Sequence, residues 1–83
     1  IFKQKTITMT KKQILNFIDE QDLASKNLLQ DLVVNFKDIT GYLWDFSKYV
    51  ELVESEAKKQ LKIGNEQLCT ELHLFLDSII VNN

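Results

Sequence analysis

The scarcity of chain-breaking residues is the feature of this 83-residue sequence that most restricts its fold. The chain contains no proline and two glycines, Gly41 and Gly64. Because turns and sheets depend on these residues, a chain with so few of them favours long helices. Hydrophobic residues make up 45% of the chain, which is enough for one modest core. We therefore expect an all-α fold.

The beginning of the chain differs from the remainder. Residues 1–9 alternate weakly between apolar and polar side chains. We expect them to form an N-terminal arm that is extended or foreign to the native protein, because Met9 and the residues after it have the character of a translation start. Thr10 and Gln13 have the spacing of a capping box, which marks the start of a helix. Residues 10–83 are thus predicted to form a single helical domain.

A heptad-like apolar pattern runs through the middle of the chain, in alternating steps of three and four residues. It comprises Leu29, Leu32, Phe36, Ile39, Leu43, Phe46, Val50, Val53 and Ala57. The pattern is typical of helix but allows two interpretations. Either one long helix spans residues 25–62 and pairs in a coiled-coil-like dimer, or two helices break near Gly41. We favour the break, because shorter helices can enclose a core within one chain.

The predicted architecture is a small up-and-down bundle of four helices. Gly64 follows three lysines, an order typical of a helix C-terminus, and so separates the last two helices. The expected helices cover about residues 11–21, 25–39, 42–63 and 66–81.

Charge and composition narrow the classes of partner. The net charge is −2, and all ten basic residues are lysines. Four of these lysines lie in the first twelve residues, so the rest of the chain is acidic. An acidic body without arginine disfavours binding to nucleic acid. The apolar runs are too short for a membrane span, and the lone Cys69 cannot form an internal disulfide, so we expect a small cytoplasmic protein.

Candidate chemical groups are few. Cys69 and His73 are four residues apart and so neighbours on a helix, but two ligands do not make a metal site. We expect a buried cysteine beside a solvent-facing histidine. Nucleophilic catalysis also needs an orienting residue and an oxyanion site, and the sequence indicates neither. The chain is therefore predicted not to be an enzyme and to use no cofactor, metal or small-molecule substrate.

Several apolar residues fall off the helical stripes and indicate a contact surface. Trp44 and Leu52 are the leading candidates, and Val34, Leu74 and Val81 depart from their stripes in the same way. Tryptophan is common as an anchor of protein interfaces. We predict that Trp44 and Leu52 are apolar anchors, and that an acidic rim attracts a basic partner. The predicted rim consists of Asp45, Glu51, Glu54 and Glu56.

Three functional hypotheses follow. The leading one is a non-enzymatic protein-binding module of the small inhibitor, immunity or adaptor type, whose partner is another protein. The second is a structural or assembly protein that self-associates through its helices, so that the partner is a second copy. The third is a DNA-binding regulator with a helix-turn-helix, in which residues 37–40 form the turn and residues 41–50 the second helix.

Overall fold

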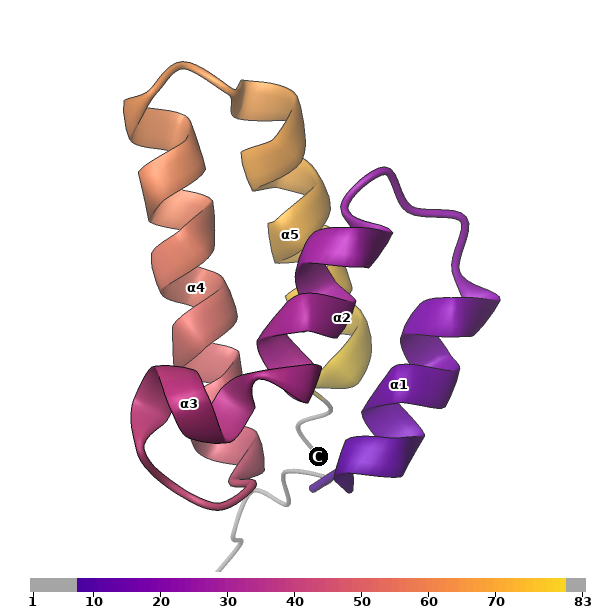
Figure 1. Ribbon diagram of the computed structural model, residues 1–83. Helices are drawn as coiled ribbons and strands as arrows, with labels where there is room; N and C mark the ends of the chain where they lie inside the picture. The colour runs from indigo at the N-terminus through magenta and orange to yellow at the C-terminus, as the bar shows by residue number, and fades with distance from the viewer. Residues whose placement is uncertain (1–7, 81–83) are drawn as a thin grey trace, which may run out of the picture.

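The computed structural model describes residues 8–80, and its all-helical bundle confirms the predicted fold class (Figure 1). Within that range the chain forms five helices and no strand. The helices are α1 (Lys11–Glu20), α2 (Lys26–Val34), α3 (Phe36–Thr40), α4 (Phe46–Lys62) and α5 (Glu66–Ile79). Most of the predicted N-terminal arm, residues 1–7, and the off-stripe Val81 lie outside the described residues.

The four longer helices alternate in direction, as expected of an up-and-down bundle. α4 and α5 form an antiparallel hairpin with the most extensive packing in the molecule, while α1 packs against α2 (Figure 1). α2 lies between α1 and the α4–α5 hairpin. The short α3 is an addition to the prediction, and it crosses from the end of α2 towards the start of α4.

Two helix ends form as their sequences predict. At the start of α1, Gln13 N–H donates to Thr10 Oγ1 over 3.2 Å and Thr10 N–H donates to Gln13 Oε1 over 2.9 Å, which completes the capping box. At the end of α4, Gly64 has a φ of 89° and Asn65 N–H donates to the Gln60 carbonyl over 2.8 Å. This is a Schellman arrangement, so the chain can reverse directly into α5.

The predicted helix over 25–39 is instead two helices that meet at Asn35. The backbone angles there are φ −98° and ψ 16°, outside the ideal helical range. Asparagine is a weak helix former because its side chain competes for backbone hydrogen bonds. The resulting bend lets Phe36, which is 1% exposed, stay in the core.

The break near Gly41 is present, and the alternative of one helix over 25–62 is wrong for this structure. Gly41 closes α3 with a φ of 80°. α4 begins at Phe46 rather than at residue 42, because the Asp45 side chain caps it by accepting from Lys48 N–H over 3.2 Å. The helix-turn-helix interpretation placed a turn at residues 37–40 and a helix from residue 41, whereas the structure has helix up to Thr40 and a loop over 41–45.

The core draws on all five helices. It consists of Ile14, Ile18, Leu29, Leu32, Val33, Phe36, Phe46, Tyr49, Val53, Ala57, Cys69, Leu72, Phe75, Leu76 and Ile79. Two members of the predicted seam, Ile39 and Leu43, are exposed, while Tyr49, outside the seam, is completely buried. Ile39 lies on the short α3 and Leu43 in the loop over 41–45, whereas Tyr49 lies on the face of α4 that also buries Phe46 and Val53. Tyr49 OH donates to the Leu29 carbonyl over 3.2 Å, and burial raises the pKa of this phenol.

A carboxylate from α5 fastens the start of α2. Glu71 accepts from Ser25 N–H over 2.7 Å, from the Ser25 hydroxyl, and from Ala24 N–H over 3.3 Å. Burial acts to raise the pKa of Glu71, but these hydrogen bonds outweigh it and hold the pKa below its ordinary value. Residues 46 or 47 positions apart in the sequence are thereby joined.

Candidate interaction surface

Three of the large exposed apolar residues lie close together in sequence, between the end of α3 and the start of α4. Ile39 is 49% exposed, Tyr42 57% and Leu43 75%. We call these three residues the α3–α4 patch. Large side chains with this exposure are ordinary when scattered, but three within five sequence positions form a candidate contact surface.

Local hydrogen bonds fix the backbone of the α3–α4 patch. Gly41 N–H donates to the Lys37 carbonyl over 2.7 Å, and Tyr42 N–H donates to Thr40 Oγ1 over 3.1 Å. The Thr40 hydroxyl in turn donates to the Phe36 carbonyl over 2.8 Å. The exposed side chains thus stand on an ordered turn, which lowers the entropy that binding must remove.

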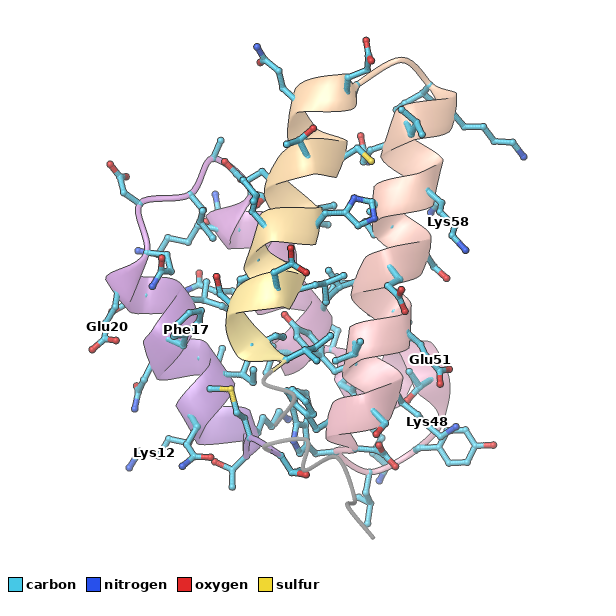
Figure 2. All side chains as sticks on the ribbon, turned by 180° about the vertical axis from the view of Figure 1, so that it is seen from behind. Lys12, Phe17, Glu20, Lys48, Glu51 and Lys58 are labelled. Carbon is cyan, nitrogen blue, oxygen red and sulfur yellow. The ribbon has the colours of Figure 1, made fainter. Side chains whose placement is uncertain are left out.

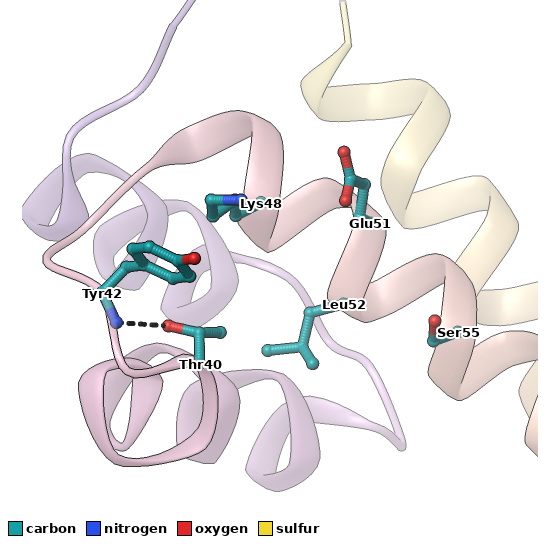
Figure 3. Close-up of a pocket in the computed structure, with 6 residues that line it drawn as sticks. All are labelled: Thr40, Tyr42, Lys48, Glu51, Leu52 and Ser55. Atoms are coloured by element: carbon teal, nitrogen blue, oxygen red, sulfur yellow. Dashed lines mark hydrogen bonds between the residues drawn. The ribbon is translucent and has the colours of Figure 1, made fainter.

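A surface groove of about 230 Å³ adjoins the patch. Its lining residues are Thr40, Tyr42, Lys48, Glu51, Leu52 and Ser55. Figure 3 shows Tyr42 and Lys48 at one end of the groove and Ser55 at the other, with Glu51 and Leu52 between them. The Lys48 ammonium lies 4.6 Å from the centre of the Tyr42 ring, a cation–π contact that orients the ring along the groove.

Trp44 lies in the loop before α4 and not on a helix, which corrects its predicted placement. The indole is half-buried, and its ring centre is 5.1 Å from that of Phe36 and 5.2 Å from that of Tyr49. Its N–H donates to the Met9 carbonyl over 3.0 Å. The structure therefore gives Trp44 an internal packing role, as the residue that ties the loop to the core.

The other predicted contact residues divide between the groove and its surroundings. Leu52 is half-buried and Glu51 exposed, and both line the groove. Asp45 is exposed and caps α4, while Glu54 is exposed one turn beyond Glu51. The structure thus brings Leu52 and Glu51 together with Tyr42, as part of one hollow.

Glu56 is not part of an open acidic rim. Its side chain is 17% exposed, accepts from Gln60 Nε2 over 3.0 Å and lies 3.7 Å from the Lys59 ammonium. The helical period explains this, because Glu56 lies about 140° round the helix from Glu51. The carboxylates that remain exposed near the patch are Asp38, Asp45, Glu51 and Glu54.

Tyr42, Leu43 and Ile39 were not among the predicted contact residues, because the heptad pattern assigned the last two to the core. A signal for them is present in the sequence. Gly41 suits a helix C-terminus and Asp45 suits a helix N-cap, so together they bracket a loop over residues 42–44. Applying both signals would have placed Tyr42 and Leu43 outside the helices.

The other candidate chemical groups, Cys69 and His73, contact each other within α5. Cys69 is buried and His73 exposed, as predicted, and His73 Nδ1 lies 3.0 Å from the Cys69 carbonyl oxygen and 3.6 Å from its sulfur. Within residues 8–80 no three His, Cys, Asp or Glu side chains are grouped to hold a metal ion. None of the helices over the same residues has the length and apolar character needed to cross a bilayer.

Comparison with known proteins gave no match: no family model, curated protein or solved structure is significantly similar to this chain.

Proposed function

We propose that this chain is a non-enzymatic protein-binding module whose contact surface is the α3–α4 patch with its adjoining groove. The observation that carries the proposal is the exposure of Ile39, Tyr42 and Leu43, three large apolar side chains within five sequence positions at an ordered turn. Burying such side chains against a partner contributes about 25 cal/mol for each Å² of apolar surface removed from water, from which the entropy lost on association is subtracted.

The charge around the patch supports a partner with basic residues. Asp38, Asp45 and Glu51 are all exposed on the elements that carry the patch. Lys37 and Lys48 are the cations of these elements nearest in sequence to the patch, but the Lys48 ammonium lies over the Tyr42 ring. Opposite charges at the edge of an interface speed encounter and fix orientation, so a partner with an apolar side chain flanked by lysine or arginine fits best.

A capture experiment tests this proposal with a matched pair of leucines. Leu43 and Leu74 are both exposed, at 75% and 61%, but Leu74 lies on α5. The wild-type chain and the Leu43→Ser and Leu74→Ser variants are immobilised, and the proteins that each retains from a lysate of the native source are quantified by mass spectrometry. We expect a protein that the wild type and Leu74→Ser retain and Leu43→Ser loses. Equal retention by all three would overturn the proposal.

A further inference from the structure

The outer face of α4 is a long exposed surface. α4 packs against α5 and α2, and Figure 2 shows Lys48, Glu51 and Lys58 pointing away from α5. At 100° per residue, Glu51, Lys58 and Lys62 fall within about 40° of one another, so they form one stripe along the helix. All three are exposed.

The charge of the side chains along this face of α4 changes from negative to positive half-way along the helix. Glu51 and Glu54 precede Ser55, while the lysines Lys58 and Lys62 follow it. Two hollows meet at Ser55: the groove beside the α3–α4 patch, and a second hollow of about 460 Å³ lined by Ser55, Lys58, Lys59 and Lys62. One hollow thus offers a carboxylate beside apolar side chains, and the other offers ammonium groups.

We propose that a second copy of this chain occupies the groove that adjoins the patch, through antiparallel pairing of the two α4 helices about a twofold axis. The axis passes midway between Ser55 and Lys58. Glu51 and Lys62 lie on either side of that midpoint, each about 8 Å from it along the helix. The twofold therefore sets Glu51 of each copy opposite Lys62 of the other, and it brings Glu54 to within one residue, about 1.5 Å, of the level of Lys58. A surface that is complementary to itself in this way gives a closed dimer.

The same axis brings exposed apolar side chains together. Ile63 is 71% exposed and directly follows Lys62. Antiparallel pairing places it at the level of Val50 of the other copy, where Tyr42 and Leu52 line the groove. Ile63 of each copy would enter the groove of the other copy, so the pairing would bury both Tyr42 and Ile63.

This pairing names the occupant of the groove beside the α3–α4 patch, and so it rests on the proposed function. A second copy is favoured over an unrelated protein because the midpoint between Glu51 and Lys62 and the midpoint between Glu54 and Lys58 fall within about half a residue of each other on one helix. Both copies carry a net charge of −2, so the local pairs must overcome a general repulsion. Pairs of exposed charges are screened by salt, so the dimer should weaken as ionic strength rises.

Charge reversal tests the pairing by sedimentation velocity over a range from low micromolar to millimolar protein at low salt. We expect the wild type to dimerise and Lys62→Glu to raise the dissociation constant on the order of tenfold, because each dimer then holds two repelling pairs. The double variant Glu51→Lys, Lys62→Glu should recover the dimer. Lys12→Glu makes the same change of charge on α1, where the side chain points away from the bundle, and should leave the dimer intact (Figure 2).

Three outcomes would overturn the pairing: a wild type that stays monomeric throughout, equal weakening by Lys12→Glu and Lys62→Glu, or no recovery in the double variant. Circular dichroism of each variant establishes that it is folded. A monomeric wild type that still retains another protein through Leu43 would overturn only the pairing. A dimer whose capture pattern is unaffected by Leu43→Ser would overturn the proposed function while leaving the charge pairing of α4 in place.

Discussion

The loops before α2 and before α4 are held by the same kind of contact but present different surfaces. In the loop over 21–25, Glu71 of α5 accepts hydrogen bonds from Ala24 and Ser25. In the loop over 41–45, the Trp44 indole donates to the Met9 carbonyl. Each loop is thus tied to a distant part of the chain by a polar contact, which orders it.

The difference lies in their apolar side chains. Leu23, the large apolar residue of the first loop, is partly buried and packs against the core. In the second loop Trp44 packs inward, whereas Tyr42 and Leu43 remain exposed. Since Trp44 already anchors that loop, the exposure of its neighbours serves no visible purpose in folding. This contrast makes the second loop the better candidate for contact with a partner.

Of the changes to these two loops, the loss of the Trp44 side chain should destabilise the fold most. Trp44→Ala removes a ring that packs between Phe36 and Tyr49, so it should destabilise the fold by about 2–3 kcal/mol, less than a fully buried tryptophan would cost. Trp44→Phe keeps a ring but loses the N–H donor, and should cost about 1 kcal/mol. Urea unfolding followed by circular dichroism measures both. A fully stable Trp44→Ala variant would restore Trp44 as a candidate contact residue.

The corresponding change at the first loop is Glu71→Ala. It leaves the N–H groups of Ala24 and Ser25 without their acceptor, and because water can reach part of this site the cost should be about 1–2 kcal/mol. Thermal unfolding measures the loss, and Glu66→Ala, at an exposed position of the same helix, is the control. Equal melting temperatures for the two variants would contradict the anchoring role of Glu71.

The pH dependence of stability tests the contribution of the Glu71 carboxylate while the side chain keeps its full length. Because the folded pKa of Glu71 lies below its ordinary value of 4.5, the unfolded chain binds the proton more readily. The contribution of Glu71 is therefore complete above about pH 4.5 and is lost as the pH falls towards the folded pKa. Unfolding of wild type and Glu71→Gln between pH 3 and pH 6 should show a shallower slope in the variant. Parallel curves would rule out this linkage.

Gly41→Ala distinguishes a loop from a continuous helix by the sign of its effect. With a φ of 80°, alanine is strained although nothing lies within 4 Å of an added Cβ, so the variant should lose about 1 kcal/mol. If residues 25–62 formed one helix, the same change would stabilise the protein by about 1 kcal/mol. Chemical unfolding of the two proteins decides between these outcomes.

Signals that act within a few residues were sufficient to predict much of the fold. The capping box at Thr10 and the turn at Gly64 depend on local backbone hydrogen bonds, and both form as expected. The periodic seam through Gly41 was a poorer guide, because periodicity carries no information across a loop of unknown length. Ile39 and Leu43 continue the pattern but are exposed, because Ile39 lies on the short α3 and Leu43 in the loop, while Tyr49 is buried on α4.

The candidate surface was only partly predictable for the same reason. Leu52 and Glu51 lie within α4, so their helical positions could be assigned, and both line the groove. Trp44 was placed on a helix that begins two residues after it, so the side that its indole faces could not be deduced. Its partners Met9, Phe36 and Tyr49 come from separate segments, and only the tertiary structure brings them together.

The smallest expected change in stability is that of Leu43→Ser, and it is most informative beside Leu23→Ser. Each variant exchanges the leucine of one loop for serine. Leu23 packs on the core, so Leu23→Ser should lower the free energy of unfolding by about 1–2 kcal/mol. Leu43 is 75% exposed, so Leu43→Ser should change it by less than about 0.5 kcal/mol. Thermal unfolding of both proteins measures the difference. If Leu43→Ser were the more destabilising of the two, Leu43 would have a role in folding, and its exposure would no longer point to a partner.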